Sequence, residues 1–231
     1  MTVTRFEDLE IWQEARELCK HFKHFKHFKH FKHFKHFKHF KHFKHFFMNF
    51  HPTSFPGLFL IEPKVFGDAR GYFFESFQQQ EFEKAIGKVE FVQDNESKSG
   101  YGVVRGLHFQ KPPYAQAKLV RCIVGSILDV VVDLRTGSPT FKKTYSVELS
   151  DSNKLQLFIP RGFAHGFVVL SEEAIFSYKV DNLYAPASEA GIRFDDPDLL
   201  IDWKLPGKAL KLSGKDRELP FFAQVDFPLF T

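Results

Sequence analysis

The sequence predicts a mainly β fold, a sandwich or barrel with short helices, for residues 48–231. Runs rich in Val, Ile, Phe and Tyr recur along this part and are separated by turn signals such as FGDARG, RTGSP and SDSN. This spacing is typical of antiparallel sandwiches and barrels, not of βαβ units. The segment FQQQEFEKAIG has a helical pattern, but it is short. The runs expected to form strands are residues 57–66, 118–134, 143–150, 155–160, 165–171 and 174–180.

An extension of different character precedes this domain. Residues 1–20 have the pattern of one amphipathic helix, with a capping box formed by Thr4 and Glu7. The opening RFEDLEIWQEARELC resembles the first helix of the small four-helix-bundle proteins encoded in rRNA intervening sequences. The other three helices of such a bundle are missing, so we interpret residues 1–20 as a helical fragment.

Residues 21–47 form a low-complexity tract in which HFK is repeated eight times. A period of three fits neither the 3.6-residue turn of an α-helix nor the alternation of a strand. We therefore interpret the tract as a translated nine-nucleotide tandem repeat. The alternative from another functional class is a non-catalytic protein that binds metal or nucleic acid through these histidines and lysines.

The charge of the chain is divided unevenly between these parts. Residues 1–47 hold 11 Lys and Arg against 5 Asp and Glu, whereas residues 48–231 hold 21 against 23. The basic balance thus belongs to the extension, and we expect no nucleic-acid partner for the main domain. Two distant cysteines, Cys19 and Cys122, indicate a reduced, cytoplasmic setting. No signal peptide and no 18-residue apolar run is visible, so no membrane partner is expected.

Two segments of the main domain place a histidine beside glycines in strand-like sequence. They are GVVRGLHFQKPPYAQAKLVRCIVG, with His108, and FIPRGFAHGFVVL, with His165. The second contains PxGxxH, which resembles the second half-motif of the cupin jelly-roll barrel. Metal-binding cupins supply HxH and a following Glu in the first half-motif, but here Phe109 and Gln110 follow His108 and no acid comes before Gly125. The sequence therefore predicts a cupin-type barrel without a metal.

A histidine that binds no metal can act as a general base if a carboxylate fixes its tautomer. Asp129 and Asp216 are the candidate carboxylates, and the sequence alone does not pair them with a histidine. The cations Arg70, Arg105 and Lys118 suit a phosphorylated or diphosphate-linked ligand and could stabilise an enolate. All three are therefore candidates for ligand binding or for charge stabilisation.

Strand geometry constrains two further candidates. Period two places Tyr178 on the same face as Phe176, where an inward phenol could donate a proton. Arg105 and His108 are three residues apart, so a flat strand would point them to opposite faces. Both reach one cavity only if Gly106 permits a bulge or the strand ends there.

From residue 48 to about residue 220 the chain resembles the dTDP-4-dehydrorhamnose 3,5-epimerase family. The segments that carry the resemblance are FGDARGYFFE, FVQDNESKS, VVRGLHFQ, AQAKLVRC, GSILDVVVDLRTGSPTF, FIPRGFAHGFVVLS, GIRFDDPDL and LSGKDRELP. They occur in the family's order and spacing. The resemblance implies 3,5-epimerisation of dTDP-4-dehydro-6-deoxy-D-glucose to dTDP-4-dehydro-L-rhamnose in dTDP-L-rhamnose biosynthesis, with no cofactor and as a homodimer.

The resemblance also implies roles for individual residues. His108 would be the base, Asp216 the group that orients it, Tyr178 the acid and Lys118 the stabiliser of the enolate oxygen. Asp129 would support His165. Residues implied to line the nucleotide-sugar site are Phe66, Arg70, Glu75, Gln93, Asn95, Arg105, Lys118, His165, Tyr184 and Glu189.

Two points stay open at this stage. A mono-epimerase or a 3,4-ketoisomerase acting on a related dTDP-4-keto sugar is an alternative within the fold, and the presence of Tyr178 favours double epimerisation. The run Asp195, Asp196 and Asp198 looks like a metal site but is interpreted as a turn with solvated carboxylates.

Overall fold

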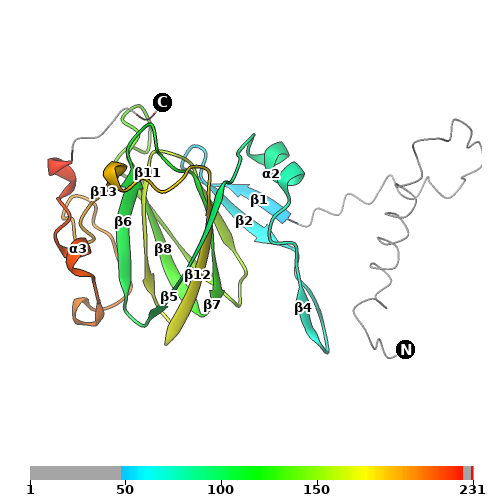
Figure 1. Cartoon of the computed structure of the whole chain (residues 1–231). Helices are drawn as coiled ribbons and strands as arrows, with labels where there is room; N and C mark the ends of the chain where they lie inside the picture. Colours follow the sequence, from blue (N-terminus) through cyan, green and yellow to red (C-terminus); the bar gives the residue numbers. More distant parts are fainter. Residues whose placement is uncertain (1–47, 226–229, 231) are drawn as a thin grey trace, which may run out of the picture. The chain divides into compact units, whose positions relative to one another are not determined.

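The computed structural model describes residues 48–225 and residue 230. Its central feature is a pair of antiparallel β-sheets that face each other (Figure 1). The mainly β prediction is confirmed. The predictions of a helix in residues 1–20 and of an irregular tract in residues 21–47 lie outside the described residues, and the domain boundary at residue 48 stays a prediction.

The larger sheet has six strands in the order β1-β2-β10-β7-β12-β5. Its strands are β1 (Met48–Pro52), β2 (Phe59–Pro63), β10 (Gln156–Ile159), β7 (Lys118–Val124), β12 (Glu173–Val180) and β5 (Gln93–Gly100). β12 pairs along its full length with β5 and is followed on its other side by β7. Strands distant in sequence therefore lie side by side, as in a jelly roll.

The smaller sheet has five strands in the order β13-β6-β11-β8-β9. Its strands are β13 (Glu189–Gly191), β6 (Val104–Gln110), β11 (Phe163–Val169), β8 (Ser126–Asp133) and β9 (Thr144–Ser150). Short helices connect and cover the sheets: α2 (Gln79–Ala85), α3 (Gly214–Arg217), η5 (Pro186–Ser188), η6 (Gly207–Ala209) and η7 (Phe222–Gln224). No helix within the described ranges is long and apolar enough to cross a membrane.

Apolar side chains fill three layers. The space between the sheets holds residues such as Val120, Ile127 and Phe176. The C-terminal segment packs Trp203 and Phe222 against the outer face of the five-stranded sheet. Helix α2, which lies in the segment with the helical pattern, packs Phe82 against the outer face of the six-stranded sheet. Each buried large side chain contributes about 1.5–3 kcal/mol, so the layers fix the two sheets that carry the site.

The predicted strand runs correspond to β2, β7 to β8, β9, β10, β11 and β12. β1 and β5 were not among them. β5 has the sequence QDNESKSG, in which no apolar alternation marks a strand. Its pairing with β12, and not its own composition, makes it a strand.

The turn at residues 195–198 differs from its prediction. Asp196 is buried, with 4% of its surface exposed. Its carboxylate accepts hydrogen bonds from the backbone N–H of Asp198 at 2.9 Å and from that of Phe222 at 2.5 Å. The prediction of a solvated carboxylate is therefore wrong for Asp196, which ties η7 to the preceding turn. Asp195 is paired with Arg193 at 2.9 Å.

A fully buried carboxylate, Asp133, holds the turn between β8 and β9. It accepts hydrogen bonds from the Arg135 guanidinium at 2.7 Å, from the Ser138 hydroxyl at 2.6 Å and from the Thr140 hydroxyl at 2.6 Å. Burial raises the pKa of the Asp133 carboxyl, but these donors outweigh it and hold the pKa below its usual value. The buried charge is thus well compensated.

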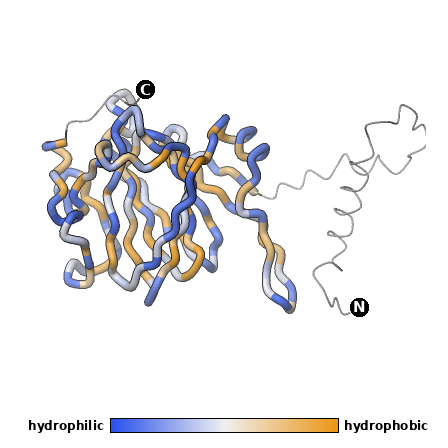
Figure 2. The backbone as a smooth tube through the Cα atoms, in the orientation of Figure 1, coloured by the Kyte–Doolittle hydropathy of each residue, from blue (hydrophilic) through white to orange (hydrophobic). Residues whose placement is uncertain are grey.

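A separate two-stranded hairpin, the arm, consists of β3 (Phe66–Asp68) and β4 (Gly71–Phe73). It projects from the domain below α2 (Figure 1). Its strands are largely apolar and its tip is hydrophilic (Figure 2). Tyr72 and Phe73 are 59% and 44% exposed. Within the chain, the Tyr72 ring stacks on that of Phe74, with the ring centroids 6.0 Å apart, and Lys154 Nζ lies 4.0 Å from the centroid of the Tyr72 ring. A hairpin this small is not stable by itself in water, so such contacts with the rest of the chain help to hold it.

Candidate active site

A β-bulge in β6 sets the position of the candidate base. His165 of β11 pairs with His108, and Phe167 pairs with Arg105, so β6 has one residue more than β11 between these pairs. Gly106, at a φ of +119°, takes up the extra residue. Leu107 consequently packs into the outer core, and both Arg105 and His108 can face the space between the sheets. The bulge at Gly106 that the sequence analysis required for Arg105 and His108 to share one side is therefore present.

His108 is held by a carboxylate from the C-terminal segment. Its Nε2–H donates to Asp216 Oδ1 at 2.7 Å. Asp216 lies in α3, where the Ser213 hydroxyl caps the helix by accepting the Asp216 N–H at 3.1 Å. Burial raises the pKa of the Asp216 carboxyl, but the hydrogen bond from His108 and its charge outweigh burial and lower it. An ionised Asp216 fixes the Nε2–H tautomer and leaves Nδ1 as the proton acceptor.

A second histidine-carboxylate pair lies beside the first. His165 Nε2–H donates to Asp129 Oδ2 at 2.8 Å, and the two side chains are 6% and 0% exposed. Burial lowers the pKa of His165, and the nearby Asp129 only partly opposes this, so the imidazole is neutral near pH 7. Asp129 Oδ1 is buried without a hydrogen-bond partner among the described residues.

Lys118, at the start of β7, brings a cation to the same space. Burial lowers the pKa of its ammonium group to about 8, against the opposing effect of Asp129 and Glu189. Lys118 Nζ lies 6.0 Å from the centroid of the Tyr178 ring. A cation in such a desolvated place can stabilise a developing oxyanion more strongly than one in water.

Tyr178 projects from β12, on the sheet opposite His108. It pairs with Asn95 of β5, and its ring lies 5.6 Å from that of the buried Phe176. Burial raises the pKa of the Tyr178 phenol, and the charge of Arg105 partly opposes this. The phenol therefore keeps its proton at neutral pH and can donate it.

Polar side chains form a rim around these groups. Glu189 of β13 accepts hydrogen bonds from Tyr184 Oη at 2.7 Å and from Lys215 Nζ at 2.6 Å. Gln93 Nε2 donates to Asn95 Oδ1 at 2.8 Å, and Gln93 Oε1 accepts the Tyr184 N–H at 3.3 Å. The rim thus links β5, the segment after β12 and β13.

Arg105 completes the rim from β6. Its Nε donates to the Ser99 hydroxyl of β5 at 3.0 Å. The residue remains exposed, so its other guanidinium donors can face an anionic group at the mouth. The bond also bridges the two sheets, from β6 to β5, the edge strand of the six-stranded sheet.

Three residues of the predicted set lie elsewhere. Phe66 and Arg70 belong to the arm, where Arg70 Nη2 lies 2.7 Å from Asp68 Oδ2. Glu75 stands between Phe74, whose ring lies 5.8 Å from the Arg121 guanidinium, and Ser76, whose carbonyl accepts from Gln156. These contacts are on the outer face of the six-stranded sheet. The structure therefore does not bring Phe66, Arg70 and Glu75 to the cavity of their own chain.

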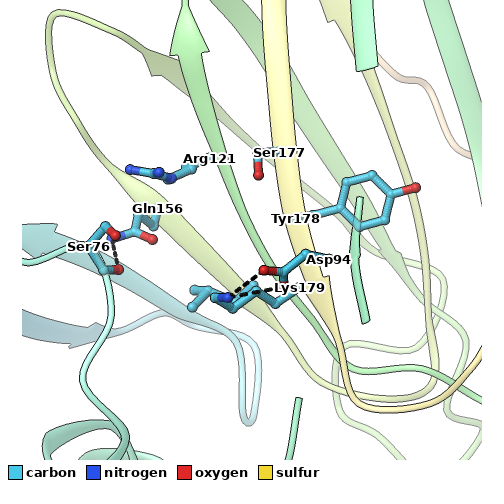
Figure 3. A pocket seen from close by; sticks show the side chains of 8 residues that line it. Ser76, Asp94, Arg121, Gln156, Ser177, Tyr178 and Lys179 are labelled. Carbon is cyan, nitrogen blue, oxygen red and sulfur yellow. Dashed lines mark hydrogen bonds and ion pairs between the residues drawn. The ribbon is translucent and has the colours of Figure 1, made fainter. Parts of the chain in front are cut away.

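A pocket on that outer face is lined by residues that include Tyr178 but not His108. Figure 3 shows Ser76, Arg121 and Gln156 on one side of β12, while the Tyr178 ring extends away from them. Lys179 and Asp94 also line this pocket and pair at 2.9 Å. Alternation along β12 explains the division, since successive side chains face opposite sides of the sheet.

Side chains suited to holding a metal ion do not gather in the described ranges. Within residues 48–225 and 230, no group of three or more His, Cys, Asp or Glu side chains is arranged to bind one. His108 and His165 are each engaged with one carboxylate instead.

The sequence matches the dTDP-4-dehydrorhamnose 3,5-epimerase family model over residues 52–224. The chain belongs to this family. It is 55% identical over 181 residues to the dTDP-4-dehydrorhamnose 3,5-epimerase of Shigella flexneri, a match that covers 78% of this chain and 99% of the relative. The predicted enzyme class, an isomerase of dTDP-rhamnose biosynthesis, is confirmed.

Solved epimerases agree in fold. The crystal structure of the enzyme from Elizabethkingia anophelis matches with a TM-score of 0.74 and 54% identity, over 77% of this chain and 97% of that one. A dTDP-6-deoxy-D-glucose-3,5-epimerase from Legionella pneumophila, in complex with dTDP-4-keto-L-rhamnose, matches with a TM-score of 0.76 and 47% identity, over 80% and 99% of the two chains. The cupin-type jelly-roll prediction is confirmed.

Sequence reasoning did not single out Ser99, Ser213 and Lys215 as parts of the site. Ser213 could have been found, because S-x-x-D is an N-terminal capping signal that also fixes Asp216. Ser99 and Lys215 had no such signal. Ser99 accepts a side-chain hydrogen bond from Arg105 across the two sheets, and Lys215 reaches Glu189 across 26 residues of sequence.

Replacing Gly106 by alanine tests the bulge. A Cβ at this position would lie 2.6 Å from Gly166 Cα and 2.7 Å from His165 O, which are backbone atoms that cannot turn aside. We expect Gly106→Ala to lower the free energy of unfolding by about 1–3 kcal/mol in urea denaturation and to reduce epimerase activity. Gly137→Ala is the matched control, since a Cβ at position 137 would meet no atom within 4 Å and the φ there is ordinary. Equal urea-denaturation midpoints for the Gly106→Ala and Gly137→Ala variants would contradict the assignment of Gly106 to a bulge that excludes a side chain.

Proposed function

We propose that the chain epimerises dTDP-4-dehydro-6-deoxy-D-glucose at C3 and C5 by general acid-base catalysis. The main support for this proposal is that His108 and Tyr178 project from the two facing sheets. His108 is a candidate base oriented by a carboxylate, and Tyr178 is a phenol that keeps its proton. A sugar between them would meet a base on one face and an acid on the other. The Legionella complex with dTDP-4-keto-L-rhamnose supports this type of ligand.

The C4 ketone of the substrate acidifies the protons on C3 and C5. His108 Nδ1 takes one of these protons, and the electron pair moves into an enolate whose oxygen is stabilised by Lys118. Tyr178 then gives a proton to the carbon from the opposite face, which inverts the centre. No electron leaves the substrate in the net reaction, and each proton removed is replaced.

The rim residues suit the remainder of the substrate. Arg105 would meet the diphosphate, and Tyr184, 54% exposed, would stack on the base or the sugar. Gln93, Asn95 and Glu189 would bind polar groups of the nucleotide sugar, as would His165, which Asp129 supports. Hydrogen bonds between Gln93 and Asn95 and between Tyr184 and Glu189 keep these side chains in place before the ligand arrives.

We further propose that the chain works as a homodimer, and the arm supports this. The arm holds Phe66 and Arg70 outside the cavity of its own chain, and its aromatic side chains are exposed. In a dimer, a second copy could both cover the arm and receive these residues together with Glu75. The net charge of residues 48–231 favours no nucleic-acid partner, and a reduced cytoplasmic setting suits the free thiol of Cys122.

Hydrogen exchange at the sugar tests the activity. In D₂O, wild-type protein should place deuterium at both C3 and C5 of dTDP-4-keto-6-deoxyglucose, as observed by NMR. His108→Ala should reduce exchange by about 10²–10⁴-fold, because it removes the general base. Tyr178→Phe should still allow proton loss but impair inversion.

The pattern of label separates the alternatives. Deuterium at one carbon only would assign a mono-epimerase, and a shift of the ketone would assign a 3,4-ketoisomerase. A wild-type protein that exchanges neither proton would contradict the proposed function for this substrate.

The rate of exchange should depend on the protonation of Lys118. Since the pKa of Lys118 is about 8, the cationic form is lost as pH rises through this value. The exchange rate should therefore fall over the same pH range, which gives the pH–rate profile an alkaline limb. Tyr178 does not produce this limb, because burial raises the pKa of its phenol above the ordinary value of 10.0. Lys118→Met should be slow at every pH and lack the limb. A wild-type rate that stays flat through this range would contradict the role of Lys118.

The molar mass in solution tests the dimer. Light scattering with size-exclusion chromatography should give twice the mass of one chain. Exchanging both Tyr72 and Phe73 for serine should shift the mass toward the monomer, because these exposed aromatic side chains are the proposed contact. The double exchange of Asp202 and Lys204 to alanine, an exposed ion pair, serves as the control. A monomeric wild type would contradict the proposal.

A further inference from the structure

The last residue of β6, Gln110, is a buried polar side chain to which the mechanism assigns no role. It is 5% exposed and lies two residues after His108. Its Oε1 accepts the backbone N–H of Ala185 at 2.7 Å. Its Nε2 donates to the carbonyl of Tyr114 at 2.7 Å and to that of Leu183 at 3.1 Å. One amide thus satisfies three backbone groups, with both of its N–H donors in use.

These three groups belong to two loops at the mouth of the site, residues 111–117 and 181–185. Other bonds join the same loops: Gln116 Nε2 donates to the Asn182 carbonyl at 2.8 Å, and Asn182 Nδ2 donates to the Pro113 carbonyl at 3.2 Å. The bond from the Asn182 side chain is exposed, whereas Gln110 is buried. The Ala117 N–H also joins the loops by donating to Asp181 Oδ1 at 2.6 Å. Gln110 is therefore one of several links between the loops, and its side chain is a buried one whose lost hydrogen bonds water would not readily replace.

The bonds of Gln110 flank one residue, Tyr184. They hold the carbonyl of Leu183, just before it, and the N–H of Ala185, just after it. The Tyr184 N–H and hydroxyl are engaged separately by Gln93 and Glu189. Gln110 therefore fixes the backbone on both sides of a ring whose surface is half exposed.

We propose that Gln110 is a positioning residue that sets the affinity for the nucleotide by fixing Tyr184, and that it takes no part in proton transfer. The inference rests on the proposed function, in which Tyr184 stacks on the substrate. A ring held in its binding position loses less conformational freedom when the ligand arrives, and binding is correspondingly tighter. The amide acts through the loop and needs no contact with the ligand.

Exchange of Gln110 for glutamate makes the sharpest test, because the two side chains have nearly the same shape. A carboxylate can still accept from the Ala185 N–H, but its second oxygen would face the carbonyls of Tyr114 and Leu183. Two donated hydrogen bonds are thereby replaced by repulsion between acceptors. Gln110→Met, of similar length and without any polar group, is the second variant should the charge impair folding.

Binding of dTDP itself, measured by calorimetry, gives a readout that does not need turnover. Both Gln110 variants should weaken dTDP binding and raise KM by about tenfold, the range for losing buried hydrogen bonds. The rate of C3 and C5 exchange at saturating substrate should change by less than about threefold. Thr140→Val, which removes a buried hydroxyl from the distant Asp133 network, controls for general loss of stability and should leave dTDP affinity unchanged.

A double variant tests whether Gln110 acts through Tyr184. If it does, Tyr184→Ala alone should weaken dTDP binding, and adding Gln110→Met should weaken it little further. Fully additive effects on dTDP affinity would overturn the proposed route. Unchanged dTDP affinity in folded Gln110 variants would overturn the inference, as would loss of saturated exchange with dTDP affinity intact.

Failure of the proposed function would give a different experimental result from failure of the positioning role of Gln110. A wild-type protein that binds dTDP but exchanges neither sugar proton would overturn the epimerase proposal. The comparison of dTDP affinity between wild type and the Gln110 variants would still decide the positioning role.

Discussion

The site depends on one backbone constraint, the extra residue that Gly106 accommodates in β6. A regular strand would turn His108 toward the outer core, where Leu107 now lies, and would leave the space between the sheets without the proposed base. The bulge also keeps Arg105 on the inner side, three residues from His108. The close approach of the Gly166 backbone leaves no room for a side chain at position 106. Packing and catalysis thus share a single local requirement on the chain.

Near the bulge, differences in burial and in neighbouring charges give side chains of similar chemistry different protonation states. Two histidines on paired strands each have a carboxylate, yet their surroundings differ. His108 is 29% exposed on its side chain and is bound to an ionised Asp216, whereas His165 is buried and neutral. Burial lowers the pKa of Lys118, between the sheets, to about 8. An accessible histidine that we propose as the base, a fixed neutral imidazole and a cation with a lowered pKa therefore arise from burial as much as from residue type.

Much of this architecture could be predicted from the sequence, because apolar runs and turn residues mark most strands, and the motifs around His108 and His165 mark the site. What could not be predicted depends on partners far along the chain. β5 lacks apolar alternation because its inner residues, among them Gln93 and Asn95, line the site, so only its pairing with β12 identifies it. The sequence suggests a solvated carboxylate for Asp196 because its buried hydrogen-bond donor, the backbone N–H of Phe222, comes 26 residues later. The separation of Arg70 from the space between the sheets likewise follows from its place in the projecting arm, which no local pattern encodes.

The composition of β5 has a consequence for how the molecule behaves in a crowded solution. β5 is the last strand of its sheet within the described residues, so one row of its backbone groups is not used in sheet pairing. Such a border can recruit strands from other molecules when it is flat and apolar. Here Asp94, Glu96 and Lys98 alternate with the amides and hydroxyls that line the site, so both faces of the border are hydrophilic. The polar residues of β5 that we propose to bind the nucleotide sugar thereby also discourage aggregation, and making β5 more apolar to strengthen the sheet would reduce solubility along with the proposed binding.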